Sequence, residues 1–315
     1  MIAFIFPGQG SQKVGMGREL ADAYPEARRT FDEADAAFVR DGGAPKTLSA
    51  LCFEGPDDQL ALTEFTQPAI LTVSTAACRL LSEQGIRPAF VAGHSLGEYS
   101  AHVAAGTFDF GDAVATVRRR GRYMQEAVPV GTGAMAAILG CDLATVTRAC
   151  EEAANGDVVS PANINGPGQI VIAGATAAVQ RASDRAKALG AKRAIPLTVS
   201  APFHCALMKP AEERLAPELR ALPARDPTVP VVANVDAEPK RTASSGIDAL
   251  VRQVSAPVWW EAVVSRLASE GVTTYVEVGP GTVLSGLVRK IHPEGRIVSF
   301  GSPADLAAVV AACST

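Results

Sequence analysis

Short apolar runs recur along the chain and end abruptly at glycine, proline or polar residues. Residues 2–6 form the first run and residues 88–92 form another; runs of this length between turn residues are typical of buried strands. A longer apolar stretch at residues 69–81 lies between Pro68 and Gly85, which predicts a helix with proline in its first turn. Strands that alternate with helices predict a parallel sheet covered on both faces.

The middle of the chain has a different pattern, because two predicted strands follow each other directly. The order is strand, helix, strand, strand, helix, strand, which is that of a ferredoxin-like unit. We therefore predict a small domain at residues 128–198, inserted into a larger α/β domain of residues 1–127 and 199–315. A cleft between two domains is a favoured place for a ligand. The strands are predicted at residues 134–139, 158–164, 169–173, 192–199, 231–235, 274–278 and 297–300, and the two helices of the small domain at residues 143–153 and 177–189.

The stretch VAGHSLGEYSAHVAAG places Ser95 between Gly93 and Gly97, where an apolar run turns into a run of helix formers. A strand, a sharp turn and a helix in this order are typical of a nucleophile elbow, whose glycines let the strand and helix pack closely. The helix N-terminus then offers free N–H groups to a developing oxyanion. The alternative is that Ser95 is an ordinary helix N-cap. The elbow predicts an α/β fold whose large, parallel-sheet domain is hydrolase-like.

A serine nucleophile needs a base, and the chain has only four histidines. His94 adjoins the serine and is expected to line its pocket, whereas His102 and His292 fit packing and solvation better. His204 follows the last strand of the small domain, at the return to the large one, which makes it the best candidate. No acid is placed obviously to orient His204, so a neutral carbonyl could hold the imidazole instead.

The run Val117 to Arg122 contains four arginines, which at first suggests a solvated basic face. Helical spacing places Arg120 and Met124 on an apolar edge and directs Arg118, Arg119 and Arg122 elsewhere. A guanidinium on an apolar edge keeps its charge and needs a partner. That partner is either a substrate carboxylate or an internal Asp or Glu, and the spacing alone leaves both open.

The first apolar run ends in the glycine-rich turn at residues 7–12. A phosphate-binding loop is excluded, because Met16 and Gly17 stand where that motif requires lysine followed by serine or threonine. Two interpretations remain open. The turn either brings backbone N–H groups to a ligand or is a simple tight turn.

Composition narrows the function classes. The chain has 315 residues, 48% of them hydrophobic, and a net charge of −4, which does not favour nucleic-acid binding as the main function. Six cysteines without a C-x-x-C pair argue against a zinc site or a disulfide framework, so we expect a cytoplasmic protein. The first residues, MIAFIF, have no basic start and are too short for a signal or membrane helix.

Seven motifs in order resemble the malonyl-CoA:acyl carrier protein transacylases, and they cover nearly the whole chain. The motifs are FPGQGSQ, GHSLGEYSA, RRGRYMQEA, ANINGPGQIVIAG, PFHCALMKPA, QVSAPVWW and EVGPGTVL. The resemblance implies a two-domain acyltransferase that moves a malonyl group from malonyl-CoA to the phosphopantetheine thiol of an acyl carrier protein, by a ping-pong mechanism through a malonyl-serine.

The resemblance also implies roles for individual residues. Ser95 is the expected nucleophile and His204 its base, with a side-chain or backbone carbonyl of Gln253 orienting the imidazole. Arg120 is expected to pair with the malonyl carboxylate. The oxyanion-hole N–H groups are expected from Gln9 and Leu96. The residues expected to line the substrate site are His94, Phe203 and Met124; Phe203 stands where some members have serine, and its ring should crowd a 2-methyl branch.

We expect no metal or cofactor, since malonyl-CoA is a substrate, and neither nucleic acid nor membrane as a partner. Acidic carrier proteins suggest a basic docking face on the enzyme, with candidates Arg118, Arg119, Arg122, Lys209, Arg289 and Lys290. The alternatives are a serine esterase or thioesterase, a polyketide acyltransferase acting in trans, and a carrier-binding scaffold without activity.

Overall fold

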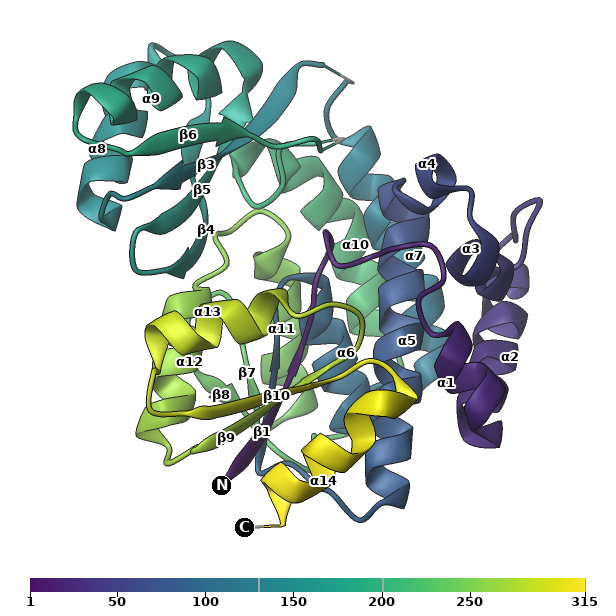
Figure 1. The fold of residues 1–315 in the computed structure, drawn as a ribbon. Coiled ribbons are helices and arrows are strands. Elements are labelled where there is room, and N and C mark those ends of the chain that lie inside the picture. The colour runs from purple at the N-terminus through teal and green to yellow at the C-terminus, as the bar shows by residue number, and fades with distance from the viewer. Residues whose placement is uncertain (130, 200, 315) are drawn as a thin grey trace.

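The strands of the computed structural model, which describes residues 1–129, 131–199 and 201–314, form two separate sheets (Figure 1). The larger has the order β10-β9-β1-β2-β7-β8. All its neighbours are parallel except β7 and β8. Its strands are β1 (Ile2–Phe6), β2 (Phe90–Gly93), β7 (Val231–Val232), β8 (Pro239–Lys240), β9 (Thr274–Val278) and β10 (Arg296–Phe300).

Strand β1 lies inside this sheet, and its side chains alternate between two cores, as the pleat requires. Phe4 and Phe6 pack in the core that includes buried residues of α2, α5, α6 and α7. Ala3 and Ile5 pack in the core formed with α12 and α13. The prediction of a parallel sheet covered on both faces is therefore confirmed for β1 and its parallel neighbours.

The helices around the large sheet differ greatly in length. The first group is α1 (Arg18–Ala23), α2 (Pro25–Arg40), α3 (Leu48–Glu54), α4 (Asp57–Leu60), α5 (Thr63–Glu83), α6 (Leu96–Ala104) and α7 (Phe110–Glu126). The second group is α10 (Lys209–Ala221), α11 (Ala243–Gln253), α12 (Trp260–Ser269), α13 (Val283–Ile291) and α14 (Leu306–Cys313), with 3-10 turns at η1 (Ala206–Met208) and η2 (Pro303–Asp305). None of the helices within the described ranges is long and apolar enough to cross a membrane.

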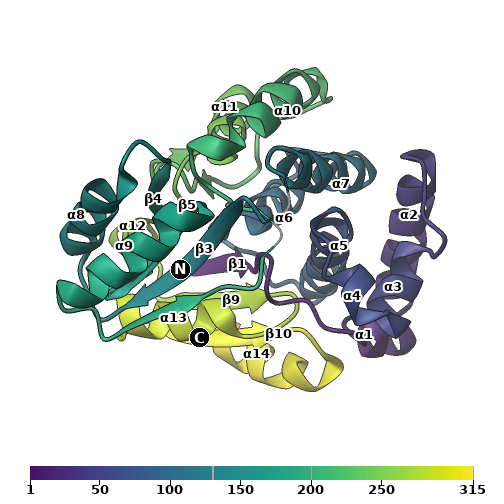
Figure 2. The same cartoon turned by 90° about the horizontal axis from the view of Figure 1, so that it is seen from above.

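The second sheet is antiparallel, with the order β4-β5-β3-β6. Its helices α8 and α9 lie at the opposite end of the molecule from α2 and α3 (Figure 2). One face packs against α8 and α9 through residues such as Ile138 and Ile172. The other face directs Met135 and Val171 into the main core. The elements are β3 (Gly133–Leu139), α8 (Leu143–Ala154), β4 (Val159–Gly166), β5 (Gln169–Ala175), α9 (Thr176–Ala188) and β6 (Arg193–Pro196).

This unit has the predicted order of strands and helices, and we propose that it is the small domain predicted at residues 128–198. Two backbone hydrogen bonds between described residues connect it to Val258 of the larger part of the chain. Ile164 N–H donates to the Val258 carbonyl at 2.9 Å, and Val258 N–H donates to Ala162 at 2.9 Å. Val130, Ser200 and Thr315, which fall within the proposed domain ranges, lie outside the described residues.

Some predicted boundaries are wrong. Helix α5 begins at Thr63, so Pro68 lies inside the helix and not in its first turn. This first turn packs closely against α7, where a Cβ on Gly121 would lie 2.6 Å from the Thr63 carbonyl oxygen. The strand predicted at residues 231–235 is only Val231–Val232, since the chain then turns back to pair with β8.

Candidate active site

Ser95 lies between the end of β2 and the start of α6, in a backbone conformation that serine rarely adopts, with φ 51° and ψ −104°. A Cβ on Gly93 would lie 1.9 Å from Gly97, and a Cβ on Gly97 would lie 2.0 Å from the Phe6 carbonyl oxygen. Glycine is therefore needed at both positions for the sharp turn. The Ser95 side chain makes no cap hydrogen bond to the helix, which argues against the N-cap alternative.

The Ser95 hydroxyl instead faces His204. Ser95 Oγ lies 2.7 Å from His204 Nε2, although the two residues are 109 positions apart. His204 Nδ1 lies 2.9 Å from the backbone carbonyl of Gln253. A carbonyl only accepts, so Nδ1 carries the proton and Nε2 is left with its lone pair toward the serine.

The electrostatic surroundings keep His204 neutral. Its side chain is 3% exposed. Burial, and then the positive charge of Arg120, lower the pKa of His204 to about 3. At neutral pH the imidazole is therefore uncharged, and its Nε2 is free to accept a proton.

Arg120, on α7, is 1% exposed, and the structure directs its guanidinium to the same serine. Nη2 donates to Ser95 Oγ at 3.1 Å and to the Gln253 side-chain oxygen at 2.9 Å, while Nη1 donates to Gln67 at 2.8 Å. No carboxylate makes a direct ion pair with Arg120 among the described residues. Arg120 therefore holds a buried positive charge beside the serine.

Ser95, His204 and Arg120 line one cavity of about 350 Å³. Gln9, His94, Phe203 and Met124 also line it, as do Met135 and Asn163 of the small sheet and the segment that follows β6, which is Leu197, Thr198 and Val199. His94 lies away from the serine hydroxyl, with Nε2 2.8 Å from Asn165 Oδ1.

The Gln9 and Leu96 backbone N–H groups have no hydrogen-bond partner within the described part of the chain. Leu96 is the first residue of α6, where an N–H is free by helix geometry. Gln9 belongs to the turn at residues 7–12, which is both a tight turn, closed by Ser11 Oγ on the Gly8 carbonyl at 2.8 Å, and a wall of the cavity. Both interpretations of this turn therefore agree with the structure.

The sequence analysis missed the polar layer beneath the serine. Asn234 Oδ1 accepts from Ser95 N–H at 2.7 Å, and its Nδ2 donates to the Gly93 carbonyl at 2.7 Å. Glu98 Oε2 in turn accepts from Asn234 N–H at 2.9 Å and from Gln253 Nε2 at 2.8 Å. The only signal in the sequence was Glu98, a glutamate among the buried positions of the apolar helix α6.

Arg118 corrects part of the predicted docking face. It is 4% exposed, and it donates to the carbonyls of Phe38, Asp41 and Gly43 at the end of α2. Helix α7 packs against both α2 and α5, so it has two buried faces and not the single apolar edge that we predicted. Arg118 is not available to a partner.

The other predicted cations are closer to the surface. Arg119 pairs with Glu218 at 2.9 Å, Arg122 with Glu64 at 3.6 Å, and Lys209 with Glu212 at 2.5 Å. Arg289 and Lys290 lie exposed at the end of α13. Lys290 Nζ donates to the Gln169 side-chain oxygen at 3.3 Å.

The remaining two histidines lie outside the site. His102 is buried, and desolvation lowers its pKa to about 3. His292 is partly exposed and contacts the Tyr275 hydroxyl at 2.9 Å. Within the described ranges, no three His, Cys, Asp or Glu side chains gather as metal ligands would.

Comparisons with known proteins agree with this geometry. The family model described as "Acyl transferase domain" matches residues 3–311. The malonyl CoA-acyl carrier protein transacylases of Escherichia coli and Bacillus subtilis are 53% and 50% identical to this chain; the matches cover 98% of both chains in the first case, and 96% of this chain and 94% of the relative in the second.

Solved structures agree as well. The malonyl CoA-acyl carrier protein transacylase of Coxiella burnetii superposes with a TM-score of 0.96 at 41% identity, covering 100% of this chain and 98% of the other. A complex of a type II PKS acyl-carrier protein with its malonyl-transacylase matches with a TM-score of 0.94 at 47% identity, covering 100% and 99%. The chain therefore belongs to the acyl transferase family, among the malonyl CoA-acyl carrier protein transacylases.

Proposed function

We propose that this protein transfers the malonyl group of malonyl-CoA to the phosphopantetheine thiol of an acyl carrier protein, through a malonyl ester on Ser95. One observation carries the proposal. Ser95 Oγ lies 2.7 Å from a neutral imidazole and 3.1 Å from a buried guanidinium, at the wall of a cavity. The first group activates a serine, and the second selects an acyl group that ends in a carboxylate.

In the first half-reaction, His204 Nε2 takes the proton of Ser95 while Oγ attacks the thioester carbonyl. The tetrahedral intermediate collapses with cleavage of the C–S bond, and the imidazolium returns the proton to the CoA thiolate. The Gln253 carbonyl, 2.9 Å from Nδ1, takes the place of the carboxylate of a serine-histidine-acid triad. It fixes the ring without adding a negative charge.

The Gln9 and Leu96 N–H groups are the donors that we assign to the oxyanion. Both are free in the described part of the chain, and Leu96 adds the positive end of the α6 dipole. Donors that are already fixed need no reorganisation as the charge develops.

Arg120 links substrate choice to the chemistry. In the free enzyme its charge is the second cause, after burial, of the low pKa of His204. A malonyl carboxylate bound to Arg120 offsets that charge, so His204 becomes a stronger base when the correct substrate is present. An acetyl group cannot do this. Phe203 and Met124, both buried at the cavity wall, are assigned to limit the size of the acyl group.

In the second half-reaction, the carrier protein's thiol attacks the malonyl ester, and the same proton transfers run in reverse. The complex of a related transacylase with an acyl-carrier protein supports this partner. No step needs a cofactor, because the chain's own groups supply each proton transfer. The six cysteines are free thiols, which supports a reducing, cytoplasmic location.

Hydrolysis is the competing outcome for an acyl-serine, and one experiment separates the two. The protein is loaded with radiolabelled malonyl-CoA, freed of excess substrate, and offered either buffer or carrier-protein thiol. We expect the label to remain on Ser95 in buffer and to move to the carrier protein within seconds. Rapid loss to water would instead indicate a thioesterase, and no loading would contradict both activities.

A further inference from the structure

Glu98 is a buried carboxylate that the proposed reaction does not use. It is 0% exposed and lies on α6, one turn after Ser95. Its Oε2 accepts the two hydrogen bonds described above, from Asn234 and Gln253. Its Oε1 is buried and has no hydrogen-bond partner among the described residues.

The Gln253 side chain connects this carboxylate to Arg120. Its Nε2 donates to Glu98 Oε2 at 2.8 Å, and its Oε1 accepts from Arg120 Nη2 at 2.9 Å. A second bond, from Nε2 to the Ser95 carbonyl at 2.9 Å, fixes the amide in this orientation. One amide group therefore separates a buried anion from a buried cation.

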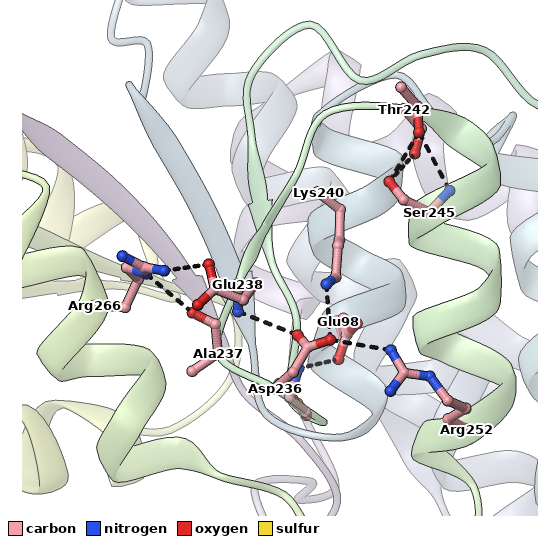
Figure 3. A network of polar contacts seen from close by, with 10 residues as sticks. Glu98, Asp236, Ala237, Glu238, Lys240, Thr242, Ser245, Arg252 and Arg266 are labelled. Carbon is pink, nitrogen blue, oxygen red and sulfur yellow. Dashed lines mark hydrogen bonds and ion pairs between the residues drawn. The ribbon is translucent and has the colours of Figure 1, made fainter.

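Arg120 has no direct carboxylate partner among the described residues, but the negative charge of Glu98 acts on it through the intervening Gln253 amide and raises its pKa against the effect of burial. Asp236 also lies near Glu98 (Figure 3), but it is bound by Lys240 at 2.8 Å and by Arg252 at 3.0 Å. A substrate carboxylate at Arg120 would add a second anion beside Glu98, whereas the single positive charge of Arg120 balances only one.

We propose that Glu98 is the resident counter-charge of Arg120, and that a substrate carboxylate binds to Arg120 together with one proton from solvent, which Glu98 takes up. The proposal rests on the proposed function. The free oxygen Oε1 can carry the proton without breaking the hydrogen bonds to Asn234 and Gln253. Glu98 thus acts as a positioning residue that sets how strongly Arg120 attracts its ligand.

The titration properties of the neighbourhood support this assignment. Burial raises the pKa of Glu98 to about 7, so its charge is easily changed near neutral pH. The other ionisable groups around it titrate elsewhere: the pKa of Tyr99 is raised to about 12, those of His102 and His204 are lowered to about 3, and those of Asp236 and His94 are also lowered. The pKa of Arg120 is lowered by burial.

The test uses malonyl-pantetheine, which carries one carboxylate and no phosphate, as a ligand for the Ser95→Ala variant, which cannot be acylated. Calorimetry in buffers of different ionisation enthalpy measures the protons taken up on binding. At pH 8 to 8.5 we expect uptake approaching one proton, with binding about 30-fold weaker at pH 8.5 than at pH 6, because a ligand that takes up one proton loses affinity about tenfold per pH unit once free Glu98 is ionised. The added Glu98→Gln change should abolish both effects.

Glu277→Gln in the same background is the matched control. Glu277 is also 0% exposed, but it caps α13 through Leu284 and Ser285 and contacts neither Arg120 nor Gln253. This variant should keep the proton uptake. Infrared difference spectra of the Ser95→Ala protein provide a readout that needs no Glu98 variant, since ligand binding should produce the C=O stretch of a protonated carboxyl group.

The outcomes separate the two proposals. Binding without proton uptake, or uptake that survives Glu98→Gln, would overturn the role of Glu98 and leave the acyltransferase proposal standing. Failure of malonyl-pantetheine to bind at all, in a folded Ser95→Ala protein, would overturn both.

Discussion

Arg118 and Arg120 are two positions apart on α7, and both are buried, at 4% and 1% exposed. Arg118 donates to three backbone carbonyls and lies over the Phe38 ring at 4.1 Å, with Asp41 3.8 Å away. Among the described residues, Arg120 donates to neutral side-chain oxygens, from two glutamines and Ser95. One guanidinium completes a helix end, and the other points to a cavity.

The difference shows that burial alone does not identify a functional arginine. Arg118 satisfies carbonyl groups that α2 leaves free at its C-terminus, with an acidic residue beside it, and it gains nothing from a ligand. Arg120 has a charge without a direct counter-ion, so a ligand carboxylate can still form a stabilising ion pair with it. The predictions below test this division.

The largest effect is expected for His204, because the reaction at the cavity that Arg120 faces depends on this base. His204→Ala should slow acylation of Ser95 by about 10² to 10⁴-fold, because the serine loses its general base. Rapid-quench measurement of acylation by malonyl-CoA checks this. An unchanged single-turnover rate would remove His204 from the mechanism.

Arg120→Ala should lower malonyl transfer and leave acetyl transfer unchanged or faster. The ratio of the two acylation efficiencies should shift by about 2–3 kcal/mol, the scale of a hydrogen-bonded charged pair. Arg120→Lys should recover little, since a point charge does not replace the planar guanidinium.

Arg119→Ala is the control for this prediction, because Arg119 lies on the same helix but pairs with Glu218 outside the cavity. If Arg119→Ala changes the malonyl-to-acetyl ratio and Arg120→Ala does not, the carboxylate partner lies elsewhere.

Arg118→Ala should have the opposite effect to Arg120→Ala: it should lower stability and leave substrate choice unchanged. It leaves three buried carbonyl groups without their donor and removes one of the two arginines that pair with Asp41, so the free energy of unfolding should fall by about 2–3 kcal/mol. Urea unfolding measures this loss, and the malonyl-to-acetyl ratio should stay at the wild-type value. A changed ratio without a loss of stability would contradict the division between the two arginines.

The smallest effect is expected for exposed cations, which neither complete the fold nor touch the acyl group. Changing Arg289 and Lys290 together to alanine should reduce transfer to an acidic carrier protein by a few-fold and weaken its salt dependence, because exposed charges act mainly on encounter. Transfer to a small pantetheine thiol should not change.

Lys187→Ala, an exposed change on α9 outside the cavity, is the control for the docking face. If ionic strength affects both acceptors equally in the wild type, the docking face is absent.

The sequence by itself determined the elements whose signals are local. Strand β1, the elbow around Ser95 and the order of the small unit follow from apolar runs, glycines and turn residues within a few positions of each other. Helical spacing placed Arg120 on a buried edge for the same reason. The family resemblance, and not any local pattern, brought in Gln253, Gln9 and Leu96.

Only the tertiary structure decided which polar residues contact one another. Asn234 reaches Ser95 across 139 positions, and Gln253 reaches Glu98 across 155, so no local pattern could pair them. Arg118 is buried because α2 covers a second face of α7, and the first turn of α5, which the local pattern did not predict, packs against Gly121. A short sequence pattern determines whether a segment forms a helix, a strand or a turn. The partner of a buried charge depends instead on which distant segments pack around it.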